Sequence, residues 1–362
     1  MPGHETDSID KWGGLMRIAI ATVQVPFEYG GAEFLADNLK KQLIARGHEA
    51  EIVTIPFKWY PARNLLNSMR IARLIDLSEM KGKRIDLMIA LKFPIYYANH
   101  ENKVLWLLHQ HREAYELWGT RYDGLDKMEH GEHVRKIIIN DDSRSISTCK
   151  KVFTISATVA ERLKKYNGID STPLYHPPFG NEDFHFAGVG DYIFCPARLE
   201  ELKRQQLLIE ALPLTRTPVK VVIAGNGKKA YIDQLNYGIE TYALSDRVRL
   251  LGWISQEEKI KWYANALAVY YGPYQEDYGY VTLEAFLSGK PVVTLVDSGG
   301  PLEFVADGKN GFVAEADPGA LAEKLDRLYE NKQKAREMGF HGLHLIKNMN
   351  LTWNAVIEKL LQ

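Results

Sequence analysis

The sequence is poor in the features that mark membrane-spanning and disulfide-bonded proteins. It contains only two cysteines, Cys149 and Cys195, which lie far apart and fit no metal-ligand spacing, as expected of a chain in a reducing compartment. No apolar run approaches the length that spans a bilayer. Residues 1–15 are polar and lack the apolar core of a signal peptide, so we interpret them as a disordered extension. These absences favour a cytoplasmic location.

A strong net charge is also missing. The formal charge of −1 over 362 residues argues against a generic nucleic-acid binder, although local basic patches can still exist. The hydrophobic share of 46% and the charged share of 25% are those of a globular protein. A chain of this length is expected to form two domains.

The first half of the chain alternates between two kinds of segment. Continuous apolar runs, typical of parallel strands buried on both faces, are separated by loops and helical patterns. These runs occupy residues 17–23, 51–55, 87–90, 103–108 and 152–155. The alternation predicts a doubly wound, Rossmann-like α/β domain over residues 16–180.

The same pattern starts again after the rigid stretch 175–180 and the polar residues that follow it, which we interpret as an interdomain connection. The second set of apolar runs occupies residues 192–195, 219–224, 248–251, 268–271 and 291–295. Helical segments separate these runs, so we predict a second Rossmann-like domain over residues 181–345.

Two glutamates, Glu276 and Glu284, stand eight positions apart around a Tyr-Gly-Tyr turn. Glu276 falls in a loop, and Glu284 falls inside a short helix predicted to begin near Tyr280 and to be closed by Gly289. The start of that helix, at Tyr280 and Val281, aims its N–H groups and positive dipole end at what precedes it, which favours a phosphate. Carboxylates on both sides of an anion site suit hydroxyl groups. The combination suggests a nucleotide-sugar.

Two cations lie near the first strand of the second domain. Arg198 follows this strand and Lys203 comes five positions later. An arginine that forks two oxygens and a lysine that acts as a point charge can together neutralise a diphosphate. The alternative is a solvated helix start in which Glu200 and Glu201 are the partners of these cations.

Other candidate ligand-binding residues follow neighbouring strands of the second domain. Gly225 and Asn226 come directly after a strand, and Trp253 follows the next one. Glycine lets a ligand approach the backbone at the carboxyl edge, where open sheets bind ligands. A simple turn and a loop with a buried tryptophan are the alternatives.

The first domain contains two weaker signals. Gly30 and Gly31 resemble a phosphate-side turn but lack the full dinucleotide fingerprint, which argues against an NAD enzyme. His109 and His111 follow a strand at the carboxyl edge, and their spacing raises the question of a metal. No third ligand has a convincing spacing, so we expect no metal site. A histidine that only caps a loop is the other interpretation.

The segment from Lys58 to Arg73 interleaves cations with aromatic and apolar residues. Basic amphipathic segments can rest on anionic membrane surfaces. The alternative, which we favour, is a surface helix of the first domain with its apolar side in the core.

Taken together, these residues resemble the retaining GT-B glycosyltransferases of the family 4 type, which are also called glycosyl transferases group 1. The resemblance covers residue 17 to the C-terminus and is stronger in the second half. Its elements follow the order of the family: residues 30–33, 153–163, 197–199 with 203, 224–227, 251–253, 276–284 and 297–303.

The resemblance implies a donor bound mainly to the C-terminal domain, an acceptor facing the N-terminal domain across a cleft, and a final helix, 346–362, that crosses back to the first domain. It implies that Arg198, Lys203 and the backbone near Gly279, Tyr280 and Val281 bind the diphosphate and that Glu284 holds the ribose. Glu276 would bind the transferred sugar. His109 matches a histidine near that sugar, although the usual acidic residue after it is Gln110 here.

The sequence therefore predicts a metal-independent, retaining transfer of a sugar from a UDP- or GDP-linked donor to a glycan or lipid-linked acceptor. The resemblance favours bacterial surface polysaccharide or glycolipid assembly. No cofactor and no nucleic-acid partner are expected, and the location is the cytoplasm or the inner face of the cell membrane. A GT-B sugar-nucleotide epimerase and a non-catalytic nucleotide-sugar-binding subunit are the alternatives.

Overall fold

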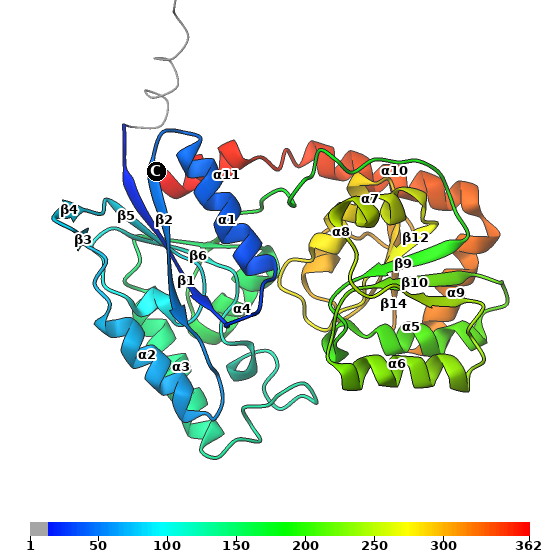
Figure 1. The fold of residues 1–362 in the computed structure, drawn as a ribbon, viewed down its shortest axis with the longest axis horizontal. Helices are drawn as coiled ribbons and strands as arrows, with labels where there is room; N and C mark the ends of the chain where they lie inside the picture. Colours follow the sequence, from blue (N-terminus) through cyan, green and yellow to red (C-terminus); the bar gives the residue numbers. More distant parts are fainter. Residues whose placement is uncertain (1–13) are drawn as a thin grey trace, which may run out of the picture. The chain divides into compact units, whose positions relative to one another are not determined.

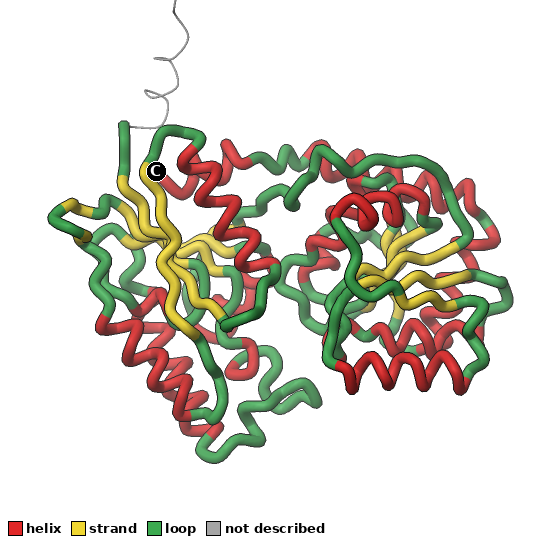
Figure 2. The backbone as a smooth tube through the Cα atoms, viewed as in Figure 1, coloured by secondary structure: helices red, strands yellow, loops and turns green. Residues whose placement is uncertain are grey.

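The structure is a computed structural model that describes residues 14–362. Most of the predicted extension, residues 1–13, lies outside the described residues. The chain forms two compact units: one runs to Phe179 and includes Thr352–Gln362, and the other is Gly180–Leu351. Each unit is a parallel sheet layered between helices (Figure 2), which confirms the predicted pair of Rossmann-like domains.

The first unit is built on a six-stranded sheet with the order β2-β1-β5-β6-β7-β8. All its neighbouring strands are parallel. The strands are β1 (Arg17–Gln24), β2 (Glu49–Pro56), β5 (Leu87–Ala90), β6 (Lys103–Leu107), β7 (Lys151–Thr154) and β8 (Thr172–Pro173). Strands β5 and β6 are buried throughout, as their continuous apolar sequence predicts. A separate antiparallel pair consists of β3 (Glu79–Met80) and β4 (Lys83–Arg84).

Helices cover both faces of this sheet. Helix α1 packs with α11 on one face, and α2 packs with α3 on the other (Figure 1). The helices of the unit are α1 (Gly31–Ile44), α2 (Arg63–Leu74), α3 (Gly131–Ile146), α4 (Ala157–Asn167) and α11 (Trp353–Leu361), with the 3-10 turns η2 (Ile95–Tyr97) and η3 (Arg112–Ala114).

The second unit repeats the architecture, with the strand order β11-β10-β9-β12-β13-β14, again all parallel. Its strands are β9 (Tyr192–Pro196), β10 (Lys220–Ala224), β11 (Val248–Leu250), β12 (Ala268–Tyr270), β13 (Val292–Leu295) and β14 (Gly311–Ala314). The strand order reverses between β9 and β12, and the carboxyl ends of strands at such a switch point are where open sheets bind ligands.

Helices again form two layers around the sheet. Helices α5, α6 and α9 lie on one face, and α7, α8 and α10 lie on the other (Figure 1). The helices are α5 (Gln205–Ala211), α6 (Lys229–Thr241), α7 (Gln256–Asn265), α8 (Tyr280–Leu287), α9 (Pro318–Glu330) and α10 (Lys332–Asn348), with the 3-10 turns η4 (Glu201–Lys203), η5 (Leu212–Leu214) and η6 (Gly300–Glu303).

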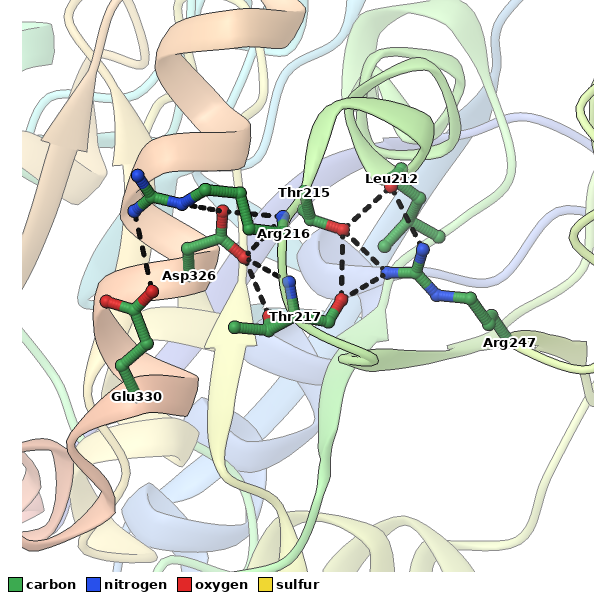
Figure 3. Close-up of polar contacts among 7 residues, drawn as sticks. All are labelled: Leu212, Thr215, Arg216, Thr217, Arg247, Asp326 and Glu330. Atoms are coloured by element: carbon green, nitrogen blue, oxygen red, sulfur yellow. Dashed lines mark hydrogen bonds and ion pairs between the residues drawn. The ribbon is translucent and has the colours of Figure 1, made fainter.

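A buried carboxylate ties α9 to the loop that leads into β10 (Figure 3). Asp326 is 2% exposed, and it accepts hydrogen bonds from the Arg216 and Thr217 backbone N–H groups at 2.9 and 3.0 Å and from the Thr217 hydroxyl at 2.7 Å. On the other side of the loop, the Arg247 guanidinium donates to the carbonyl of Leu212 and the hydroxyl of Thr215. This network fixes the amino edge of the sheet, opposite the edge that carries the candidate site.

The last part of the chain departs from the single helix predicted over residues 346–362. Helix α10 ends at Asn348, Asn350 adopts a left-handed conformation with φ of 48°, and α11 begins only at Trp353. The Thr352 hydroxyl caps α11 by accepting a hydrogen bond from the backbone N–H of Ala355, which explains where this helix starts. Helix α11 belongs to the first unit.

Candidate functional site

Three loops of the second unit are joined by backbone hydrogen bonds at the carboxyl edge of its sheet. After β9 and β10, Ala197 N–H donates to the carbonyl of Ala224 at 3.0 Å and Leu199 N–H donates to that of Asn226 at 2.8 Å. After β11, the carbonyl of Gly252 accepts from Gly225 N–H at 2.8 Å. The structure thereby brings together the segments that contain Arg198, Asn226 and Trp253, as the sequence predicted for one ligand site.

Gly225 is required at this junction. Its φ is +146°, and a Cβ there would lie 2.0 Å from the carbonyl oxygen of Ala197. A side chain would therefore force the two loops apart. The glycine therefore serves the close approach of two backbones.

Arg198 and Trp253 present their side chains at the surface of this edge. The Arg198 side chain is 55% exposed and lies 3.9 Å from the Glu200 carboxylate, which is the partner named in the alternative interpretation. The Trp253 indole is 70% exposed, so the alternative of a buried tryptophan is wrong. Both side chains are placed where a ligand can reach them.

The predicted residues Lys203 and Glu276 are in direct contact. The Lys203 Nζ donates to the Glu276 carboxylate, and the two side chains are 15% and 16% exposed, respectively. The hydroxyl of Tyr271, which is 5% exposed, donates to the same carboxylate oxygen at 2.9 Å and lies 3.5 Å from Lys203 Nζ. Burial and the Glu276 charge raise the pKa of Tyr271 well above its usual value, so it remains a donor.

Hydrogen bonds of Arg204 and of the loop at Asp297 hold Lys203 and Glu276 in place. The Arg204 guanidinium, which is buried, forks both oxygens of Asp297 at 2.6 and 2.9 Å and donates to the carbonyl of Gly272. The loop that Asp297 begins then holds Glu276, whose N–H donates to the carbonyl of Ser298 at 2.8 Å. Because Arg204 directly follows Lys203, these hydrogen bonds position both members of the Lys203–Glu276 ion pair.

Gly279 precedes the first residue of α8, the helix that contains Glu284, which the sequence predicted to begin near Tyr280. Its φ of +92° is in the left-handed region, and a Cβ there would lie 3.0 Å from the ring of Pro301. Only glycine avoids both the strain and the contact. The helix that follows directs its positive end toward the residues just before Gly279, among them Glu276. Tyr280 and Val281 form its first turn.

Glu284 lies on the second turn of α8 and is nearly buried, with a side chain that is 10% exposed. One carboxylate oxygen accepts from Lys259 Nζ at 2.7 Å and the other accepts from the Tyr263 hydroxyl at 2.8 Å. Both partners come from α7. The sequence predicted Glu284 as a ligand-binding carboxylate and did not predict these two neighbours.

In the first unit, Gly30 and Gly31 stand at the start of α1. The Glu33 carboxylate accepts a hydrogen bond from Gly30 N–H at 2.9 Å and lies 3.4 Å from Lys92 Nζ. A negative charge already occupies the positive end of this helix. An anion bound there would have to displace or repel Glu33, so these glycines contribute less to the phosphate-binding hypothesis than Gly279 does.

His109 follows β6, as predicted, and its Nδ1 lies 2.6 Å from the carbonyl oxygen of Gln110. A carbonyl only accepts, so Nδ1 carries the proton and Nε2 is the acceptor of the neutral ring. The Gln110 side chain is buried and donates to the Asn167 side chain. The contact uses an N–H of the Gln110 amide, which the acidic residue implied by the resemblance would lack.

A buried carboxylate lies behind this loop. Asp142 is fully buried and accepts hydrogen bonds from Tyr96, Tyr97 and Tyr115, while the Tyr115 hydroxyl lies 3.5 Å from the Asn167 amide nitrogen. Burial raises the pKa of Asp142 to about 6 despite the three donors. The network couples the position of Gln110 to the core of the unit.

The basic segment of the first unit forms α2 and the loop before it. Buried residues on its inner side include Leu65, Met69 and Ala72, while Ile71 and Leu74 are 53% and 85% exposed. The cations Lys58, Arg63 and Arg70 are exposed as well, whereas Arg73 pairs with Asp141 at 2.6 Å. In residues 14–362 no helix combines the length and the apolar character that a bilayer crossing requires.

Besides Lys259 and Tyr263, three positioning residues of the site were not predicted: Tyr271, Arg204 and Asp297. Each has a weak signal in the sequence. Arg204 adjoins a predicted cation, Tyr271 ends the apolar run before Glu276, and Asp297 opens the loop after β13. Only the fold shows that these three segments meet.

Known proteins resemble the chain in sequence and in fold. Residues 184–342 match the family model described as glycosyl transferases group 1. An uncharacterized glycosyltransferase of Methanocaldococcus jannaschii is 25% identical over 359 residues, which cover 86% of this chain and 89% of the relative. The D-inositol 3-phosphate glycosyltransferase of Frankia alni is 34% identical over 150 residues, but the match covers only 38% of this chain and 37% of that protein.

A solved structure supports the same fold. The Anabaena protein HepE, in complex with UDP and glucose, superimposes with a TM-score of 0.66 at 18% identity, covering 95% of this chain and 98% of that one. The two Rossmann-like units and this likeness define the GT-B fold. The family match over residues 184–342 agrees with the resemblance found in the sequence: this part of the second unit is similar to the glycosyl transferases group 1.

Proposed function

We propose that the chain transfers a sugar from a UDP- or GDP-linked donor to a glycan or lipid-linked acceptor, with retention of the anomeric configuration and without a metal ion. The observation that carries this proposal is the largely shielded Lys203–Glu276 pair, contacted by Tyr271, just before the start of α8. The HepE complex with UDP and glucose supports the choice of a nucleotide-sugar as donor.

The charges of the site fit the charges that develop in the reaction. The bond between the anomeric carbon and the phosphate oxygen breaks, and its electron pair leaves with the nucleoside diphosphate. Lys203, Arg198 and the N-terminus of α8 stabilise that negative charge. Glu276 binds hydroxyls of the sugar and stabilises the positive charge on its ring. The acceptor oxygen bonds to the anomeric carbon, and its proton passes to the leaving phosphate oxygen.

Lys203 can serve both partners at once. An ammonium group has three N–H donors. One can stay on Glu276 while another reaches a phosphate oxygen, so the two ends of the donor are held by side chains that already fix one another. This preorganised arrangement spares the reorganisation that separate residues would need at the moment of bond breaking.

The proposal is tested by following release of the nucleoside diphosphate from UDP- and GDP-sugars with a panel of glycan and glycolipid acceptors. We expect turnover in EDTA, and we expect Glu276→Ala, Lys203→Ala and Arg198→Ala each to lower kcat at least about 100-fold. The anomeric proton of the product should have the configuration of the donor. Wild-type turnover in all three variants, an absolute need for an added divalent cation, or an inverted product would each contradict the corresponding part of the proposal.

We assign His109 a catalytic role near the transferred sugar. Its Nδ1–H is engaged by the carbonyl of Gln110, which orients Nε2 as a hydrogen-bond acceptor. His109→Asn keeps a polar side chain and should lower kcat about 10- to 100-fold. An unchanged kcat would remove His109 from the catalytic residues.

We propose further that the outward side of α2 rests on an anionic membrane surface. Ile71 and Leu74 are exposed on α2, and the cations Lys58, Arg63 and Arg70 are exposed in the same segment. Each cation near such a surface contributes about 1 kcal/mol. This location suits a lipid-linked acceptor in surface polysaccharide or glycolipid assembly, on the cytoplasmic face of the cell membrane.

Sedimentation with vesicles that contain phosphatidylserine tests the membrane proposal. We expect binding that falls with added salt and that is lost when Lys58, Arg63 and Arg70 are all changed to Glu. A control with the same change in charge replaces three exposed lysines of the second unit, Lys261, Lys334 and Lys347. Equal loss of binding in both triple variants, or no binding by the wild type, would refute the proposal.

A further inference from the structure

Two side chains of α7 hold the Glu284 carboxylate, and this arrangement affects how Glu284 can bind the ribose of a nucleotide. Lys259 and Tyr263 stand one helical turn apart on α7, so both face α8. Lys259 Nζ lies 2.7 Å from Glu284 Oε1, and the Tyr263 hydroxyl lies 2.8 Å from Oε2. Each oxygen of the carboxylate therefore has one fixed donor.

Burial makes these donors necessary. Tyr263 is fully buried, and the side chains of Glu284 and Lys259 are 10% and 24% exposed. A carboxylate without partners in such surroundings is costly. Lys259 forms an ion pair with Glu284, and Tyr263, whose own pKa is raised well above its usual value by burial, stays protonated and donates.

The surroundings restrict both donors to this one position. Tyr263 packs against Phe184 and Phe194, with ring centroids 5.6 and 5.0 Å away. Lys259 Nζ lies 5.6 Å from the centroid of the Phe184 ring. The carboxylate is consequently fixed in rotation, with one oxygen toward Lys259 and the other toward Tyr263.

A carboxylate held in this way keeps one further acceptor position on each oxygen. Two adjacent hydroxyl groups can donate to these two positions together, whereas a single hydroxyl can use only one. The arrangement is suited to a vicinal diol, such as the 2′- and 3′-hydroxyls of ribose.

We infer that Lys259 and Tyr263 are positioning residues that make Glu284 selective for the ribose diol of the donor nucleotide over its 2′-deoxy counterpart. The inference rests on the proposed function, because it takes Glu284 as the residue that binds the ribose. It adds the specificity of that contact and the two residues that produce it.

Calorimetric titration in EDTA tests the inference with UDP, GDP and their 2′-deoxy forms. We expect the wild type to bind the ribonucleotide at least about 10-fold more tightly than the deoxy form, because the loss of one hydroxyl leaves a buried acceptor unpaired. Lys259→Met should reduce this ratio to below about 3-fold, since the carboxylate loses both its fixed orientation and its charge partner. Lys259→Arg should preserve the preference.

Lys261→Met is the matched control, since Lys261 lies on the same helix and is exposed. It should leave both affinities unchanged. Tyr263→Phe, checked for folding by circular dichroism, should also reduce the ratio of the affinities for the ribonucleotide and its 2′-deoxy form. A Lys259→Met variant that loses affinity equally for the ribo and deoxy forms, or that keeps the full preference, overturns the inference while the proposed function stands. Failure of the wild type to bind any of the four nucleotides overturns both.

Discussion

At the scale of single residues, the site depends on side chains that were expected to bind a ligand and that also bind each other. Lys203 and Glu276 lie 73 positions apart in sequence and share a contact that is mostly shielded from water. Residue types and spacing predicted both groups, because a diphosphate needs a cation and a sugar needs a carboxylate. Their contact could not be predicted, since it depends on how the loops after β9 and β12 meet.

Tyr271 provides a test at this scale. Its hydroxyl donates to Glu276 at 2.9 Å, so Tyr271→Phe removes one of the donors that orient the carboxylate. We expect kcat to fall about 10-fold with little change in the KM for the donor, a loss of ~1.4 kcal/mol typical of a hydrogen bond to a charged group. Steady-state kinetics would show this, with the more exposed Tyr242→Phe as the control. An unaltered kcat would mean that Tyr271 does not position Glu276.

At the scale of elements, most strands and helices follow from the sequence. The continuous apolar run of β1 and the helix from Tyr280 to Leu287 lie where periodicity and glycine placed them. The end of the chain differs, since Met349–Thr352 interrupts the helix predicted over residues 346–362. Local propensity does not show this break, which follows from the left-handed Asn350 and the cap at Thr352.

The anchoring of α9 gives a prediction for stability. Asp326→Ala would leave the N–H groups of Arg216 and Thr217 and the Thr217 hydroxyl without their buried acceptor (Figure 3). We expect the free energy of unfolding of the protein to fall by about 2–4 kcal/mol in urea titrations. Glu330→Ala removes a half-exposed ion-pair partner of Arg216 and should lower the free energy of unfolding by less than about 0.5 kcal/mol. Equal costs for the two variants would contradict the role of Asp326.

His176 gives a second prediction at this scale, because it packs α11 onto the first unit. Its ring lies 5.5 Å from Trp106 and 5.7 Å from Trp353, measured between centroids. Burial lowers the pKa of His176 from 6.5 to about 4. Between these values the unfolded chain binds a proton that the folded chain does not, so the contribution of His176 to stability is lost as the pH falls through this window.

The test compares the wild type with His176→Gln at two pH values. The advantage of the wild type in unfolding free energy should be about 2 kcal/mol smaller at pH 5 than at pH 7.5. Asp142, whose raised pKa of about 6 acts with the opposite sign, is present in both proteins and cancels in the difference. An advantage that does not change with pH would show that His176 is not buried in its neutral form.

At the scale of the whole molecule, the chain contains two units of the same architecture. The sequence motifs that indicate function are more numerous in the second unit than in the first. The second unit contains the family match over residues 184–342 and most of the predicted site. The architecture of both units was predictable because alternating apolar runs reflect burial on both faces of a parallel sheet. The ligand specificity was not, since it depends on partners such as Lys259 that no motif marks.

The central claim is that the second unit binds a nucleoside diphosphate through Lys203 and uses Glu276 on the sugar. Calorimetric titration of the wild type, Lys203→Met and Glu276→Gln with UDP and GDP in EDTA tests it most directly. We expect the wild type to bind at least one of the two nucleotides, Lys203→Met to bind it at least about 10-fold more weakly, and Glu276→Gln to bind it within about 3-fold of the wild type. No binding by the wild type, or equal binding by Lys203→Met, would contradict the claim.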